Sequence, residues 1–217
     1  MAARKRRPRG LFVVLEGPDR SGKSTQAGLL ARHLRERGLA VLHTREPGGT
    51  GLAEAIRKVL LDTRYTVRPL TELMLYEAAR AQHTEDALRP ALREGRVVVS
   101  ERYTLATLAY QGAGRALPEP LIRRLNRIAT SGLEPDLTLI LDVPDREFHR
   151  RLTRRADRLE LESRRFRERV REGYRRLARS ERRTFLIDAD RPVDAVRRDV
   201  LRLVERVLAR RAGMKAG

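Results

Sequence analysis

Short apolar runs alternate along the chain with longer segments in which apolar positions recur every three or four residues. Several of the runs are almost continuously apolar, which is typical of strands buried on both faces of a parallel sheet. The predicted strands are residues 11–16, 41–44, 96–101, 137–143 and 184–187.

Helices are predicted between these strands. Several of the periodic segments begin with a proline, which suits the first turn of a helix, and Gly38 is a typical residue after a helix end. The predicted helices are residues 24–37, 52–61, 69–80, 118–130, 144–155, 162–179 and 192–211.

The order of these elements predicts an α/β fold. Alternating strands and helices form right-handed crossovers, so we expect a doubly wound five-stranded parallel sheet with helices on both faces. Ligands of such sheets bind at the carboxyl ends of the strands. We expect one domain over residues 11–213, a basic flexible tail at 1–10, and a short charged lid near 154–160.

The composition excludes several kinds of chemistry. The 217 residues include no cysteine, so disulfides, thiolate metal sites and cysteine nucleophiles are ruled out. No apolar run approaches the roughly 18 residues that a membrane helix needs, and the basic N-terminal residues are not followed by the apolar part of a signal peptide. The expected location is therefore the cytoplasm, without a membrane partner.

The net charge of +19 has two explanations, a nucleic-acid-binding surface or small phosphorylated ligands in an arginine-rich protein. Many arginines stand beside Glu or Asp on predicted helices, as they do on solvated faces. Aromatic residues make up only 4% of the chain and tryptophan is absent, which leaves few platforms for stacked bases. The composition therefore favours small ligands over nucleic acid.

The strongest motif is GPDRSGKS at residues 17–24, which matches G-x-x-x-x-G-K-[ST] between a predicted strand and a predicted helix. In such a loop the backbone N–H groups hold a polyphosphate, Lys23 adds a cation near the β- and γ-phosphates, and Ser24 can bind Mg²⁺. The predicted ATP-binding residues are Gly17, Pro18, Asp19, Arg20, Ser21, Gly22, Lys23, Ser24 and Thr25.

Two further features bear on the class of nucleotide-binding protein. No lysine follows an asparagine, so the Asn-Lys-x-Asp motif with which GTPases read guanine is missing.

Asp142, in the fourth predicted strand, has two possible roles. It could be a carboxylate on the metal side of the nucleotide or, the preferred interpretation, a cap for the helix that follows.

Arginines stand at the ends of two other predicted strands. The second strand leads into TREPGGT at residues 44–50, and the third ends in ERY at 101–103. An arginine followed by a glycine-rich turn offers two parallel hydrogen bonds to a phosphate, with backbone N–H groups behind it. A Pro-Gly-Gly sequence alone indicates only a turn. Arg45 and Arg102 together with the phosphate loop, however, predict a site where two phosphorylated ligands meet.

These motifs resemble the thymidylate kinase family over almost the whole chain, and TREPGGT is more family-specific than the phosphate loop. Other matching segments are LFVVLEG, ERY, AYQG, PDLT, DRLE and IDA, at residues 11–17, 101–103, 109–112, 135–138, 157–160 and 187–189. The resemblance implies a P-loop nucleoside monophosphate kinase fold, transfer of the γ-phosphate of ATP to dTMP to give dTDP, and a homodimer.

The resemblance also implies roles for single residues. Lys23, Arg20 and Arg102 would be catalytic, and Ser24 would bind Mg²⁺ together with ATP. The implied dTMP-binding residues are Asp19, Arg45, Tyr76, Arg80, Arg102, Thr107, Tyr110 and Gln111. In this set, Arg45 and Arg102 would bind the phosphate. Tyr76 would stack on thymine, Arg80 would bond the base, and Thr107 and Gln111 would read the base edge. Asp19 would reach the 3′-hydroxyl, and Tyr110 would crowd a ribose 2′-hydroxyl.

Such a reaction needs no general base, because the second pKa of the attacking phosphate is about 6 and the group is already anionic. Positioning and charge neutralisation suffice, so no histidine is given a catalytic role. The chain departs from the family at Glu101, where most members carry Asp, and we predict Glu101 on the metal side with Ser24. Two alternatives stay open, namely another pyrimidine monophosphate acceptor (dUMP or CMP) and a nucleic-acid-binding P-loop ATPase.

Overall fold

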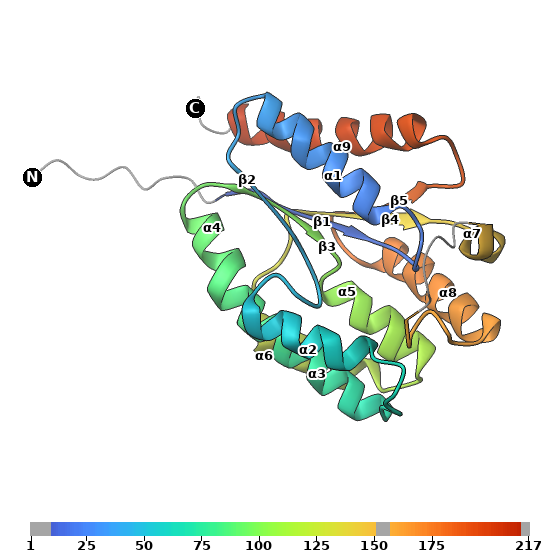
Figure 1. Cartoon of the computed structure of the whole chain (residues 1–217). Helices are drawn as coiled ribbons and strands as arrows, with labels where there is room; N and C mark the ends of the chain where they lie inside the picture. Colours follow the sequence, from blue (N-terminus) through green and yellow to red (C-terminus); the bar gives the residue numbers. More distant parts are fainter. Residues whose placement is uncertain (1–9, 151–156, 214–217) are drawn as a thin grey trace, which may run out of the picture.

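The computed structural model describes residues 10–150 and 157–213. Their central element is a five-stranded, fully parallel sheet with the strand order β2-β3-β1-β4-β5 (Figure 1). The strands are β1 (Phe12–Glu16), β2 (Val41–Arg45), β3 (Val97–Glu101), β4 (Leu137–Asp142) and β5 (Thr184–Asp188). The predicted α/β fold with a doubly wound parallel sheet is confirmed.

Helices cover both faces of the sheet (Figure 1). One face carries α1 (Lys23–Glu36) and α9 (Val193–Gly213). The other face carries α2 (Gly51–Leu61), α3 (Pro69–His83), α4 (Arg89–Arg93), α5 (Thr104–Thr107), α6 (Glu119–Thr130) and α8 (Arg164–Ser180), while α7 (Asp145–Arg150) follows the end of β4.

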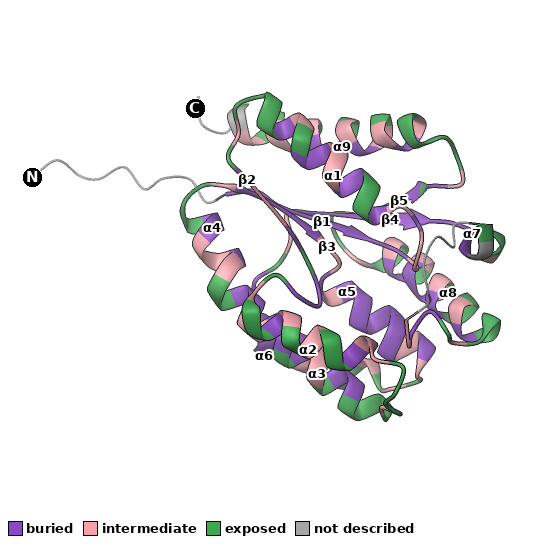
Figure 2. Ribbon diagram, viewed as in Figure 1, coloured by how far each residue is buried: buried purple, intermediate pink, exposed green. Residues whose placement is uncertain are grey.

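The central strand shows why the strand runs are continuously apolar. All five residues of β1 are buried, and Figure 2 shows the same for most of the sheet. Val13 and Leu15 pack with residues of α1 and α9, whereas Phe12 and Val14 pack with Tyr103 on the opposite face. Because both faces of β1 are covered, every position along it contributes to the core.

Two helical segments, residues 84–93 and 104–114, were not predicted from the sequence. The helix predicted at 69–80 continues to His83 and then through the π-helical η1 (Thr84–Leu88) into α4, and α5 continues into the π-helical η2 (Leu108–Gly114). The first segment contains a proline and the second two glycines, residues that lower helix propensity. Tertiary packing overrides that propensity, since η2 packs closely against α8.

Several of the predicted segments are only partly described. The tail at 1–9, the end of the predicted helix 144–155 and residues 154–156 of the predicted lid lie outside the described residues. Residues 157–160 of the lid form a turn against the end of α2, where Arg158 donates from Nε to the carbonyl of Leu60 over 2.8 Å. Within the described ranges, the helices are all too short or too polar to cross a bilayer.

Candidate active site

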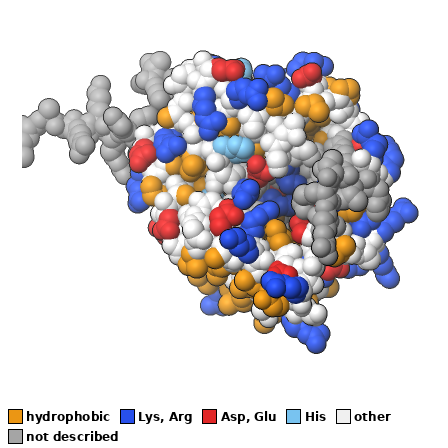
Figure 3. Space-filling view, in the orientation of Figure 1, with side chains coloured by type: hydrophobic (Ala, Val, Ile, Leu, Met, Phe, Trp, Pro, Cys, Tyr) orange, Lys and Arg blue, Asp and Glu red, His pale blue; other side chains and the backbone are white. Residues whose placement is uncertain are grey.

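The predicted site residues gather along one edge of the sheet, where the parallel strands end. The phosphate loop follows β1, Arg45 ends β2, and Glu101 with Arg102 ends β3. Figure 3 shows a hollow in the middle of this face, in which basic and acidic side chains lie together. Parallel pairing of these neighbouring strands therefore brings the separate motifs into one region.

The phosphate loop has the backbone that its glycines allow. Gly17 and Gly22 have φ of 136° and 92°, and a Cβ on Gly17 would lie only 2.4 Å from the carbonyl oxygen of Leu141. Lys23 is buried and donates from Nζ to the carbonyl oxygens of Gly17 and Pro18, over 3.0 and 2.6 Å. Burial and the nearby Arg102 lower the pKa of Lys23 to about 7.

A cavity of about 730 Å³ adjoins this loop on the side of α9. Most of the predicted ATP-binding residues line it, together with residues that follow β5. These loop residues are Arg20, Ser21, Gly22, Lys23, Ser24 and Thr25. Pro18 and Asp19 do not line this cavity but line other hollows, so the loop borders more than one space.

Ser24 and Glu101 lie together, as their predicted role requires. The Ser24 hydroxyl donates to Oε2 of Glu101, and Nε2 of His43 lies 3.0 Å from Oε1. Although burial raises the pKa of Glu101, the contacts with His43 and Ser24 hold it below its usual value. Glu101 is therefore an anion beside the hydroxyl of the loop.

These two oxygen donors fit Mg²⁺, which prefers oxygen ligands and takes few from protein when phosphates and water supply the rest. No cluster of three or more acidic or histidine side chains that could hold a metal alone occurs in the described part of the chain. A cation at Ser24 and Glu101 would thus be held jointly with a bound phosphate.

A second, narrower cavity of about 60 Å³ lies on the other side of the loop. It brings together six of the eight predicted dTMP-binding residues. The six are Asp19, Tyr76, Arg102, Thr107, Tyr110 and Gln111. Arg45 and Arg80 are not among its lining residues.

Arg102 connects this cavity to the phosphate loop. Its backbone has a φ of 70°, and its guanidinium donates to Asp19, to the carbonyl of Gly17 over 3.1 Å and to the hydroxyl of Tyr110 over 3.0 Å. The Tyr110 hydroxyl also donates to Asp19 over 2.7 Å. Burial raises the pKa of Asp19, but Arg102 and Lys23 outweigh it and keep the pKa below its usual value. Asp19 therefore stays ionised between two cations.

Two further arginines, Arg45 and Arg57, lie near each other, and one of them lines this cavity. Arg45 is exposed and donates to both carboxylate oxygens of Glu54 over 3.2 Å. Arg57, which the sequence analysis missed, lines the cavity and donates to the carbonyl of Pro47 over 2.9 Å. Burial and the neighbouring Arg45 and Arg102 lower the pKa of Arg57, as expected where cations converge on an anion site. Its only sequence signal was its position three residues after Glu54 on one helix.

Arg80 lies behind the cavity, not in its lining. The fully buried guanidinium donates to Glu46 and Glu77 over 2.8 Å and to Asn126 over 2.7 Å. It also reaches the hydroxyl of Thr107 over 3.3 Å. These four polar side chains give Arg80 a supporting role behind the cavity, while its contact with a base stays a prediction.

The same network fixes the TREPGGT segment. Glu46 Oε1 lies 3.0 Å from Nδ1 of His83, whose Nε2 lies 2.8 Å from the hydroxyl of Thr44. A Cβ on Gly49 would lie 2.6 Å from the His83 ring, so the turn packs directly on the histidine. Neither Glu46 nor His83 was singled out from the sequence, because their contacts join segments that are far apart along the chain.

Arg20 joins the loop to the described part of the predicted lid. Its Nη2 lies 3.1 Å from Oε2 of Glu160, and its guanidinium lies 4.5 Å from the ring centre of Phe148. Both ionic side chains are largely buried. The predicted catalytic arginine is thus positioned by a residue from the DRLE segment.

The carboxylate of Asp142 pairs with arginines and does not cap the helix that follows β4. Its carboxylate accepts hydrogen bonds from Arg171 over 2.7 and 2.9 Å and lies 3.2 Å from Arg175, both on α8. The ion pairs tie the end of β4 to α8.

Comparison with known proteins identifies similar sequences and a similar structure. The family model described as thymidylate kinase matches residues 15–200. The chain is 46% identical to the thymidylate kinase of Symbiobacterium thermophilum over 93% of this chain and 95% of that protein. It is also 46% identical to the thymidylate kinase of Deinococcus radiodurans over 88% and 94%. The crystal structure of thymidylate kinase from Ehrlichia chaffeensis superposes with a TM-score of 0.76 at 32% identity, covering 91% of this chain and all of that one.

The buried network predicts a large stability effect at Arg80. Replacing it in Arg80→Met leaves Glu46 and Glu77 without their cation, and we expect the free energy of unfolding to fall by about 3–5 kcal/mol. Urea denaturation followed by circular dichroism measures the change. Arg64→Met is the matched control, because Arg64 pairs with Asp62 at the surface and its loss should not be measurable. Equal stability of the two variants would contradict the role given to Arg80.

Proposed function

Because the chain belongs to the thymidylate kinase family, we propose that its site transfers the γ-phosphate of ATP to dTMP and yields dTDP and ADP for dTTP synthesis. The observation that carries the proposal is the cluster of Asp19, Arg102 and Tyr110, which joins the phosphate loop to the narrow cavity. A donor phosphate on the loop and an acceptor phosphate at Arg102 would then face each other. Residues 11–213 would form the kinase domain.

ATP occupies the larger cavity in this proposal. Loop N–H groups and Lys23 bind its phosphates, and Arg20 adds a second cation at the transferring group. Ser24, with Glu101 beside it, would hold Mg²⁺, which would supply further charge neutralisation at the phosphates. These groups act electrostatically, in a partly buried setting where charge interactions are stronger than in water.

The acceptor occupies the smaller cavity. Arg45, Arg57 and Arg102 surround the dTMP phosphate, while Tyr76 stacks on the base and Tyr110 limits the room at the ribose. A phosphate oxygen of dTMP forms the new bond to the γ-phosphorus, and the bond from that phosphorus to the β–γ bridging oxygen breaks. The electron pair leaves with ADP, and no side chain has to remove a proton.

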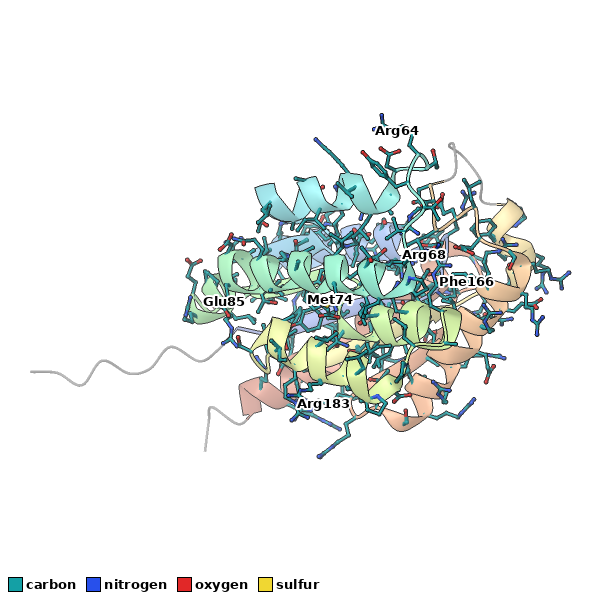
Figure 4. The ribbon with its side chains drawn as sticks, turned by 90° about the horizontal axis from the view of Figure 1, so that it is seen from below. Arg64, Arg68, Met74, Glu85, Phe166 and Arg183 are labelled. Carbon is teal, nitrogen blue, oxygen red and sulfur yellow. The ribbon has the colours of Figure 1, made fainter. Side chains whose placement is uncertain are left out.

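A second copy of the chain is the proposed partner. Exposed apolar side chains lie over α2, α3 and α6, which pack side by side, and Figure 3 shows such side chains gathered over α2 and α3. Figure 4 shows Met74 near the middle of this layer. The residues are Leu52, Val59, Leu70, Met74, Leu121 and Ile128. Contiguous exposed apolar surface of this kind typically marks an interface.

The proposed function predicts a defined substrate pattern. With ATP and Mg²⁺, dTMP should give dTDP faster than dUMP, dCMP or CMP gives its diphosphate, as measured by chromatography of the products. Lys23→Ala should lower kcat by about 10²–10³-fold, because a cation at the transferring phosphate is lost. Lys58→Ala, on the exposed side of α2, is the matched control and should keep normal turnover. Turnover of another monophosphate without any dTDP would reject the assignment.

The proposed role of Glu101 on the metal side predicts that its replacement changes the Mg²⁺ dependence of turnover. Glu101→Gln keeps the shape but removes the charge, so turnover should fall severalfold and half-maximal activity should need more Mg²⁺. Glu101→Asp should retain more activity. His43→Ala is the control, because it removes only the supporting contact to Glu101. If titration of Mg²⁺ gives the same profile for Glu101→Gln and for the unmodified protein, Glu101 does not act on the metal side.

The proposed homodimer predicts a concentration-dependent mass. Sedimentation equilibrium should give the mass of two chains at micromolar concentration, and Met74→Glu should shift the equilibrium to the monomer because it places a charge in the apolar face. Met74 is about half exposed in the single chain, so its replacement should not unfold the monomer. A monomeric unmodified protein would disprove the dimer.

A further inference from the structure

A buried carboxylate that the proposed mechanism does not use lies beside the acceptor cavity. Glu72, in the first turn of α3, is fully buried and contacts three side chains from other segments. Gln111 donates from Nε2 to its Oε1 over 2.8 Å. Arg115 donates to both oxygens over 3.2 and 3.1 Å, and Nη1 of Arg158 lies 2.6 Å from Oε2.

The two arginines keep Glu72 ionised. Burial raises its pKa, but Arg115, Gln111 and Arg158 outweigh that effect and hold the pKa below its usual value. Arg115 is itself held by Glu162 over 2.6 Å and by the ring of Phe166, whose centre lies 4.7 Å from the guanidinium. An ionised carboxylate has no proton to donate, so Glu72 can only accept hydrogen bonds.

This restriction determines the orientation of the Gln111 amide. Only the NH₂ group of the Gln111 amide can face the acceptor Glu72, so the carbonyl oxygen of the amide must point away from Glu72. Gln111 is buried and lines the acceptor cavity together with Tyr76 and Thr107. The amide is therefore fixed as a hydrogen-bond acceptor toward the cavity, and an inverted amide would turn its NH₂ group away from Glu72.

The polarity of this acceptor distinguishes pyrimidine bases. Thymine and uracil carry a hydrogen-bond donor, N3–H, on the edge where cytosine carries the N3 lone pair. We propose that Glu72 is a positioning residue for base selectivity, which fixes Gln111 so that its carbonyl oxygen accepts from N3–H of the acceptor base. This inference rests on the proposed function. It assigns the rejection of cytosine to a residue that does not touch the substrate.

The test is the ratio of kcat/KM for dTMP to kcat/KM for dCMP. Glu72→Gln replaces an obligatory acceptor by an amide that can also donate, so the side-chain amide of Gln111 can adopt the inverted orientation. The ratio should fall about tenfold, since one unpaired buried polar group typically changes an equilibrium by that factor or more. Most of the change should appear as a higher KM for dTMP, with the KM for ATP unaltered. The ratio of dTMP to dUMP is the internal control and should stay within about twofold, because both bases carry N3–H.

A double-mutant cycle shows whether Glu72 acts through Gln111. In the Gln111→Ala background, adding Glu72→Gln should leave the ratio of dTMP to dCMP unchanged. A further fall in that background would overturn the proposal. An equal loss of dTMP and dCMP turnover in Glu72→Gln would also overturn it and leave Glu72 with a purely structural role.

Two results separate this inference from the proposed function. If the unmodified protein does not phosphorylate dTMP, the proposed function fails. If it does so but the ratio is insensitive to Glu72, only the inference fails. Should Glu72→Gln lose the thermal unfolding transition, Glu72→Asp makes the same comparison, because it keeps the charge but withdraws the carboxylate from Gln111. The ratio should then fall by a smaller factor, and an unchanged ratio would count against the proposal.

Discussion

The hydrogen bonds of Arg102 hold the two halves of the site together. Its backbone N–H binds the carbonyl of Leu15 in the neighbouring strand over 2.8 Å, and its side chain reaches Gly17, Asp19 and two tyrosines. Its backbone has a positive φ, and its guanidinium lies against the phosphate loop. Loss of these bonds would separate the phosphate loop from the acceptor cavity, although every strand could remain in place.

Arginine also explains how so many acidic groups are buried around this site. Glu46 is paired with Arg80, and Glu72 with Arg115 and Arg158. Burying one of these carboxylates alone would be costly, whereas a planar guanidinium satisfies several oxygens at once. Some of the basic residues are therefore internal partners of buried carboxylates, and these ion pairs add nothing to the positive net charge of the chain.

The sequence predicted the architecture because the strand signal is local. Continuous apolar runs identified all five strands to within one residue at either end, and the glycines and Lys23 identified the phosphate loop. Segments 84–93 and 104–114 were missed, because their proline and glycines argue against helix and only packing reverses that. Arg57 and Glu72 were missed for a related reason. A helical arginine or glutamate looks like surface charge until the tertiary structure shows which side of the helix is covered.

The buried position of Lys23 gives the site a proton linkage. With a pKa of about 7, a sizeable fraction of molecules carries a neutral amine near neutral pH. A polyanion bound beside Nζ favours the ammonium form, so its binding takes up protons from solvent, more of them per site as the pH rises above 7. By reciprocity, raising the pH above 7 weakens the binding of that anion. A loop that buries its lysine beside an arginine thereby makes phosphate affinity depend on pH within the physiological range.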